Sequence, residues 1–345
     1  MKFELCLSWL GALAAGMADT GPQVCEADLE APVEKVWSVF STEEGLKLLG
    51  VAQAKLDFRV GGKMQTHYDP KGVIGDEGTI ENTIIAFEPM RMVAFRITKP
   101  PAKFPFKNTY KDTWTVATMT NLGDGRTRLR LSGMGYTADP ESQRMRAFFE
   151  QGNAWVLEEL KRRLSGEGTP GPEAPGPKSP AAPGLAGESD PLAPVVVEAV
   201  LRAPPAEVWN RWTTREGMES VFPGSRIELR IGGAYELRLD PDSPEGRTGS
   251  EGCTVLSYEP RSMLSFTWVA PARLEHARAG RTWVVLHIQP HGAHGTRVIL
   301  DHLGFAEGAV TDPDHTKEWR EVRAHAAGVW PKVLAKLRAG LESRR

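Results

Sequence analysis

The chain has 345 residues, of which 41% are hydrophobic and 25% charged, and its formal net charge at pH 7 is −2. This length predicts about two domains, and the composition is that of a globular protein with well-formed cores. The near-neutral charge excludes a global electrostatic attraction to nucleic acid or to an anionic membrane. Cys6, Cys25 and Cys253 lie far apart without a CxxC pair, so they predict neither a zinc site nor a disulfide framework.

The chain begins with MKFELCLSWLGALAAGMADT, in which a lysine precedes an apolar run that ends in small residues. This pattern resembles a secretory leader, and residues 1–18 would then direct export to the periplasm. Glu4 argues against export because it leaves the start barely positive, and Met17 is an alternative start. Residues 1–21 are therefore a leader or a mis-assigned start, and we expect a cytoplasmic protein. The run is too short to predict a stable membrane span.

The first expected domain, residues 22–164, opens with a strand at 24–30 and then a helix. Val33, Val36, Trp37 and Phe40 recur at the spacing of one helix face. A second helical turn is expected at 44–49, and a strand at 55–60 leads into a glycine pair suited to a tight turn. The later elements are strands near 78–87, 91–98, 111–120 and 126–134 and a long helix over about 140–164.

The segment 165–194 contains eight of the chain's 26 prolines and almost no large apolar residue. Such a composition cannot build a core and predicts an extended linker. A second domain is expected over 195–345.

The second domain repeats the first in the same order of motifs. LEAPVEKVWSVFSTEEG (29–45) matches LRAPPAEVWNRWTTREG (201–217) at eight of seventeen positions. AFEPMRMVAF (86–95) matches SYEPRSMLSF (257–266), DTWTV (112–116) matches RTWVV (281–285), and SGMGY (132–136) matches DHLGF (301–305). The glycine pair also recurs, in RVGGKM and RIGGAY. Conserved order over the whole length indicates a duplicated domain. The closing helix of the second copy is expected at about 314–341, with a kink at Pro331 or a break near Gly328.

Motifs such as EAPVEKVW, EGCTVLSYEPRSMLSFTW, RTWVVL and TRVILDHLGF resemble the bacterial activator-of-heat-shock-ATPase type of SRPBCC domain, in the START-like (helix-grip) superfamily. The resemblance covers roughly 24–164 and 195–341, and it is closer in the second copy. It implies an α+β fold with two tandem helix-grip domains, each a curved antiparallel sheet wrapped around a long C-terminal helix. It also implies a cavity between the sheet and that helix.

Strand alternation predicts which side chains line this cavity. We paired the last two strands of each copy so that Trp114 faces Gly133 and Trp283 faces His302. The expected pocket residues in the first copy are Trp114, Val116, Leu129, Leu131, Phe149 and Trp155. In the second copy they are Trp268, Trp283, Val285, Val298, Leu300, His302 and Trp330. An alternative is that these side chains only pack in the core.

Histidines concentrate in the second copy, and His287, His302 and His325 could converge from two strands and a helix. No HxH or HExxH spacing supports a metal site, so we expect none, and no cofactor. His302 is the one candidate for a general acid or base, because histidine titrates near neutral pH. A core histidine with satisfied hydrogen bonds is the alternative.

Basic residues mark the same loop in both copies. Residues 99–111 carry four lysines among Phe104, Phe106 and Tyr110, and residues 270–281 carry three arginines. Such loops can hold an anionic ligand or an acidic partner surface, although a solvated loop is the simpler interpretation. No nucleic-acid-binding module is present, and we expect no nucleic-acid partner.

The leading hypothesis is a protein that binds a small hydrophobic ligand and is not an enzyme. One alternative is a co-chaperone-like regulator of an ATPase, which the resemblance implies and which requires a protein partner. The other is a small cyclase-like or hydrolase-like enzyme that uses the second-domain pocket.

Overall fold

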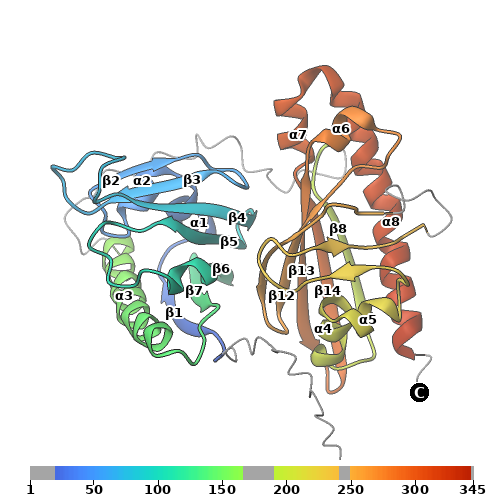
Figure 1. The fold of residues 1–345 in the computed structure, drawn as a ribbon, viewed down its shortest axis with the longest axis horizontal. Helices are drawn as coiled ribbons and strands as arrows, with labels where there is room; N and C mark the ends of the chain where they lie inside the picture. The colour runs from blue at the N-terminus through green and yellow to red at the C-terminus, as the bar shows by residue number, and fades with distance from the viewer. Residues whose placement is uncertain (1–19, 166–189, 241–248, 343–345) are drawn as a thin grey trace, which may run out of the picture.

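The computed structural model describes residues 20–165, 190–240 and 249–342 (Figure 1). Most of the predicted leader and most of the predicted linker lie outside these residues. Within them the structure confirms the tandem α+β arrangement of two similar halves, each with antiparallel strands and a long closing helix.

The first domain forms a single antiparallel sheet of seven strands in the order β1-β7-β6-β5-β4-β3-β2. The elements of this domain are β1 (Gln23–Leu29), α1 (Val33–Ser41), α2 (Glu43–Lys47), β2 (Gln53–Leu56), β3 (Lys63–His67), β4 (Ile80–Glu88), β5 (Met92–Lys99), η1 (Thr109–Asp112), β6 (Trp114–Gly123), β7 (Arg126–Met134) and α3 (Pro140–Leu164). The long helix predicted at about 140–164 has the same bounds as α3.

The second domain repeats this order, but its described strands divide into a five-stranded sheet, β11-β12-β13-β14-β8, and a two-stranded sheet, β10-β9. An additional helix, α7, precedes the closing helix. The elements are β8 (Val195–Leu201), α4 (Pro205–Thr213), α5 (Arg215–Glu219), β9 (Arg226–Ile227), β10 (Tyr235–Glu236), β11 (Val255–Glu259), β12 (Met263–Trp268), α6 (Glu275–Ala279), β13 (Thr282–His291), β14 (Gly295–Leu303), α7 (Phe305–Thr311), η2 (Pro313–His315) and α8 (Thr316–Glu342).

The repeated glycine pair has the same physical role in both domains. Gly61 and Gly232 adopt positive φ angles of 79° and 74°, which glycine tolerates best. A Cβ on Gly62 would lie 2.0 Å from the Asp57 carbonyl oxygen, and a Cβ on the equivalent glycine of the second copy would meet Glu228 in the same way. The pair is therefore explained by turn geometry, as the sequence predicts.

The closing helix α8 continues through Gly328 and Pro331, so the break predicted near Gly328 is wrong. A proline removes the hydrogen bond to the carbonyl four residues earlier, which here belongs to Ala327. Ala327 is exposed, so water can solvate that carbonyl and the helix can continue.

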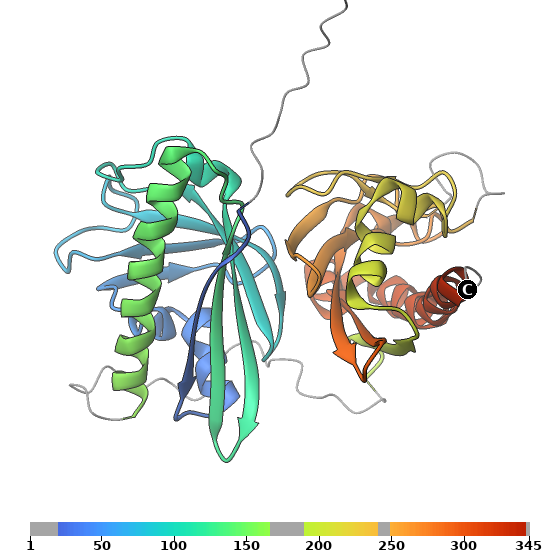
Figure 2. The same cartoon turned by 90° about the horizontal axis from the view of Figure 1, so that it is seen from below.

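The two domains meet through the sheet faces that point away from their long helices. Figures 1 and 2 show α3 and α8 on opposite outer sides of the molecule with the two sheets between them. Met263, Trp283, Val285 and Leu303 of the second domain join the hydrophobic cluster of the first. Their repeat equivalents, Met92, Trp114, Val116 and Met134, belong to the same cluster. Equivalent surfaces thus face one another, as in a symmetric dimer.

Two reciprocal hydrogen bonds follow this internal symmetry. The indole N–H of Trp114 donates to the carbonyl of Tyr258 at 3.1 Å, and the indole N–H of Trp283 donates to the carbonyl of Phe87 at 2.7 Å. Each acceptor occupies the repeat position of the other. The duplication is therefore visible in the domain interface as well as in the two folds.

Candidate functional site

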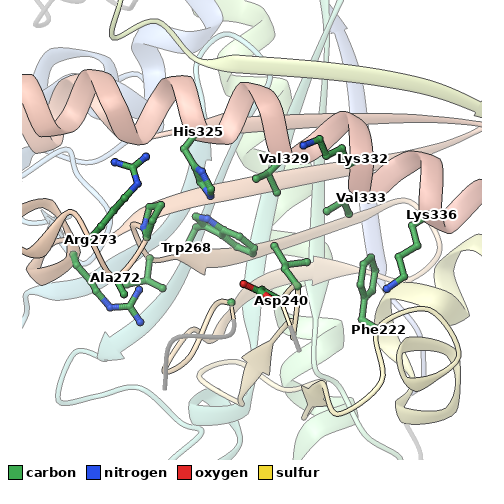
Figure 3. A pocket seen from close by; sticks show the side chains of 15 residues that line it. Phe222, Asp240, Trp268, Ala272, Arg273, His325, Val329, Lys332, Val333 and Lys336 are labelled. Carbon is green, nitrogen blue, oxygen red and sulfur yellow. The ribbon is translucent and has the colours of Figure 1, made fainter. Parts of the chain in front are cut away.

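A cavity of about 690 Å³ lies in the second domain, beside the helix α8 (Figure 3). Its walls come from α8, the end of β12 with the loop that follows it, and the segments around Phe222 and Leu239. A space of this size falls in the range of small-molecule sites in proteins.

The inner wall of the cavity is aromatic and aliphatic. Trp268 is 5% exposed and packs against the Trp330 ring with a centroid distance of 4.6 Å. Phe222 and Val333, both also buried, contribute further apolar surface, and Val329 extends from α8 between His325 and Lys332 in Figure 3. This wall offers dispersion contacts to an apolar guest.

Basic side chains surround the opening. Arg273 and Arg278 come from the loop and the short helix α6, while Lys332 and Lys336 extend from α8. Asp240 is the one acidic residue among the described lining residues. The cavity therefore combines an apolar wall with a positively charged rim.

His325 also lines this rim, where the neighbouring positive charges affect its protonation. Partial burial lowers the pKa of His325 below its usual value, and the nearby charges of Arg273 and Lys332 lower this pKa further. Both causes favour the neutral imidazole over a third positive charge at this place.

His302 lies behind this wall, fully buried, and both of its ring nitrogens are occupied. The Trp330 indole N–H donates to His302 Nδ1 at 2.9 Å, so the ring proton resides on Nε2, which lies 2.8 Å from Thr282 Oγ1. Burial, and to a lesser degree the charge of His325, lowers the pKa of His302 to about 3. This geometry is that of a core histidine with satisfied hydrogen bonds and does not support the acid–base hypothesis.

The predicted strand pairing was wrong by one residue in both copies. Trp283 pairs with Leu303 instead of His302, and Trp114 pairs with Met134 instead of Gly133. Because side chains alternate along a strand, this shift turns Trp283 and Val285 to the opposite sheet face.

The same shift moves Trp114 and Val116 out of the predicted pocket. These two and their counterparts, Trp283 and Val285, lie in the domain interface. On β7 and β14, the strands that pair with β6 and β13, the predicted inward-facing residues do lie on the inner face of the sheet.

The remaining second-domain predictions lie on the inner side, where Trp268, Val298, Leu300 and Trp330 form one core cluster with α8. Among these four, only Trp268 lines the described cavity.

The first-domain predictions divide among three places. Leu129 and Leu131 are buried on the inner face of the sheet, on the side opposite to Arg130 and Ser132. Phe149 belongs to a separate aromatic cluster with Phe104, Phe106 and Tyr110. Trp155 is 53% exposed and contacts Gly50, so it is a surface residue.

The three second-domain histidines do not converge, because His287 lies in the domain interface. There its Nε2 lies 2.5 Å from Glu88 Oε2, and Asp301 is close enough to complete a group of three possible metal ligands. The Arg91 guanidinium lies 2.8 Å from Glu88 and 3.5 Å from Asp301. Because Arg91 and His287 already pair with these carboxylates, we interpret the group as an interdomain ion cluster.

Burial, and next the charge of Glu88, raises the pKa of Asp301 to about 7. Burial lowers the pKa of His287, but the hydrogen bond and the charge of Glu88 outweigh it, so the net shift is upward. The protons of this cluster are thus coupled to the contact between the domains.

Sequence reasoning missed most of the cavity residues. Phe222, Val329, Lys332 and Lys336 were not among the predicted pocket residues. The basic loop 270–281 gave the usable signal, since Arg273 and Arg278 lie there. A second signal was not used: Val329, Lys332 and Lys336 stand at the i, i+3, i+7 spacing that places them on one helix face.

Two segments, residues 30–165 and 202–342, match a protein family described as activator of Hsp90 ATPase homolog 1-like protein. The chain belongs to this family. The two matches follow the duplication and leave the region between the domains unmatched. No curated protein matches the chain.

The comparison with solved structures found matches to less than half of the chain and matches to most of it. MLL2253 from Mesorhizobium loti is 24% identical, with a TM-score of 0.35, and the match covers 44% of this chain and 98% of that protein. The di-domain ARO/CYC BexL from the BE-7585A biosynthetic pathway is 10% identical, with a TM-score of 0.35, over 93% of this chain and 98% of that one. The Aha1 dimer from Colwellia psychrerythraea is 14% identical, with a TM-score of 0.33, over 41% and 95%.

Within the described ranges, each helix is too short or too polar to span a bilayer.

Proposed function

We propose that this protein binds a small hydrophobic molecule in the second-domain cavity. The observation that carries the proposal is the 690 Å³ space beside α8 with its aromatic and aliphatic wall. A cavity with such a wall is the usual form of a small-molecule site, because each guest atom transferred from water to apolar contact contributes favourable free energy.

The position of Trp268 provides a direct readout of binding. Its side chain is 5% exposed in the protein, and it forms part of the wall. A guest in contact with this indole would change the intrinsic tryptophan fluorescence, and preferential binding to the folded state would raise the melting temperature.

The experiment uses a neutral apolar dye, N-phenylnaphthylamine, with the full-length protein. We expect dye fluorescence to rise on binding and the melting temperature to rise with dye concentration. Val329→Trp should abolish uptake, since Val329 lines the cavity and a tryptophan there would occupy it. Ala335→Trp is the matched control, because Ala335 lies exposed on the same helix and does not itself line the cavity.

Failure of the dye to bind the folded wild-type protein would contradict the proposal. So would equal uptake by wild type and a folded Val329→Trp variant.

A further inference from the structure

We propose that the guest is an amphipathic anion, whose apolar body contacts the Trp268 wall and whose anionic head group is held by Lys332 and Arg273. This inference rests on the proposed binding function and specifies the chemical class of the ligand. A carboxylate, a sulfonate or a phosphate monoester shares the required chemistry.

The first support is the imbalance of charge around the opening. Among the described lining residues, Arg273, Arg278, Lys332 and Lys336 carry positive charge, while Asp240 alone carries negative charge. Apolar walls of low dielectric strengthen the resulting potential, because they screen charges less than water does. A neutral guest would gain no charge–charge attraction from this positive potential, whereas an anion would.

The second support is that these cations differ in how their charge is already used. Arg278 donates to the Ala270 carbonyl and pairs with Glu251 at 3.3 Å, so it has a structural role. Lys336 lies over the Phe222 ring, 4.9 Å from its centroid. These two basic groups therefore help to build the wall.

Arg273 and Lys332 remain as the groups suited to a ligand. Arg273 pairs with Glu321 at 3.0 Å, but both side chains are substantially exposed, and this contact uses one of the five guanidinium N–H donors. The structure records no ion pair of Lys332 with any described residue, and Lys332 is exposed at the rim. Since exposed ion pairs contribute little, an incoming anion can compete with Glu321 at small cost.

The arrangement in space also suits such a ligand. Figure 3 shows His325, Lys332 and Lys336 extending from α8, with Trp268 and Phe222 on the opposite side of the space. A head group near Lys332 would thus leave the apolar body directed toward the two aromatic rings. The depressed pKa of His325 supports this placement, because Arg273 and Lys332 both contribute to it.

The test compares two dyes that share a naphthalene and an aniline ring but differ in charge. Anilinonaphthalene sulfonate carries the anionic group, and N-phenylnaphthylamine does not. We expect wild-type protein at low salt to bind the sulfonate about tenfold more tightly, which corresponds to about 1.4 kcal/mol. Added salt should reduce this preference, because it screens the head-group contact.

Variants then locate the effect. The double variant Arg273→Gln/Lys332→Gln should weaken sulfonate binding about tenfold and change binding of the neutral amine less than twofold. Lys317→Gln, on the exposed part of the same helix and outside the lining, should change neither affinity. Val329→Trp should prevent both dyes from binding.

The outcomes distinguish this inference from the function on which it rests. If the neutral dye binds as tightly as the sulfonate, or if the double variant weakens both equally, the anionic ligand class is wrong and the cavity still binds apolar guests. Sulfonate binding that survives Val329→Trp would place the anion elsewhere and overturn the inference. If neither dye binds, both proposals fail.

Discussion

The two domains share one sheet face and differ on the other. On the outer face, Trp114 and Trp283 occupy equivalent positions and make reciprocal bonds across the interface. On the inner face, the equivalent of His302 is Gly133, where a Cβ would meet the Tyr136 ring at 3.1 Å. The contact between the copies therefore fixes the outer residues in both, whereas the inner residues could diverge.

The loop before β6 and its counterpart before β13 show the same divergence. In the first domain Phe104 and Phe106 pack with Phe148 and Phe149 of α3 into an aromatic cluster. In the second domain the corresponding loop contributes Arg273 to the cavity rim. One repeated segment thus closes an aromatic contact in one copy and supplies positive charge to a cavity in the other.

The largest effect is expected from breaking the shared face. Trp283→Ala should lower the free energy of unfolding by about 3–5 kcal/mol, because it removes a buried ring and its bond to the Phe87 carbonyl. Trp114→Ala should cost a similar amount, since its environment is equivalent. Urea unfolding followed by circular dichroism measures both. Trp155→Ala, at an exposed position, is the control and should cost less than about 1 kcal/mol. A large difference between the two interface variants would contradict the symmetry.

The next effect is a pH dependence of stability that only the second domain should show, because its inner face carries His302 where the first domain has Gly133. The pKa of folded His302 is about 3, below its usual value of 6.5, so the unfolded chain binds a proton that the folded domain does not. Stability should therefore fall as the pH decreases from 6.5, by up to about 1.4 kcal/mol per pH unit. His302→Phe should remove this contribution. The measurement is the free energy of unfolding from pH 7 to 4.5 for both proteins. Parallel curves would show that His302 is not the cause.

A smaller effect of opposite sign is expected at the interdomain ion cluster. The pKa of Asp301 is raised to about 7, so its proton contributes stability that is present at low pH and lost as the pH rises through 7. The raised pKa of His287 acts in the same direction. Asp301→Asn keeps the shape and removes the charge beside Glu88. It should make the protein more stable than wild type at pH 8 and flatten the pH dependence between 5 and 8. The measurement is calorimetric unfolding of both proteins across this pH range. An equal change of stability with pH in wild type and Asp301→Asn would contradict this account.

The smallest expected effect concerns His325 and sharpens the comparison of ligand classes. An anion beside Arg273, Lys332 and His325 would offset the charges that lower the histidine pKa. Saturation with anilinonaphthalene sulfonate should therefore raise the pKa of His325 back toward its usual value, whereas the neutral dye should not. Arg278 and Asp240 also face this space and are unchanged in the comparison. The measurement is an NMR titration of the histidine ring protons. An equal response to both dyes would argue against a head group at this rim.

Much of the fold was predictable because the same pattern of motifs occurs in both halves of the sequence. The bounds of α3 and of the paired motifs follow from periodicity and repetition, which depend on neighbouring residues. Strand register is different, because one residue at a turn changes every later pairing. The β13–β14 ladder is regular from Trp283–Leu303 to His291–Gly295 and was mispaired by one residue, as β6–β7 was, so the error lies in where the turn was placed.

The candidate site was predictable only in part. Trp268 was found because it lies on a strand with clear alternation, and the loop of Arg273 was noticed for its charge. Lys332 and Lys336 were missed, since a lysine on an exposed helix face is usually solvated. Their role depends on how α8 approaches the end of β12, a tertiary fact that spacing along the chain does not encode.

The reciprocal tryptophan bonds have a consequence for how the protein behaves on dilution. In a dimer of separate chains such a contact would dissociate at low concentration, whereas here the two partners belong to one polypeptide and their effective concentration is constant. Cutting the backbone between Leu164 and Val195 would convert this contact into an ordinary bimolecular equilibrium.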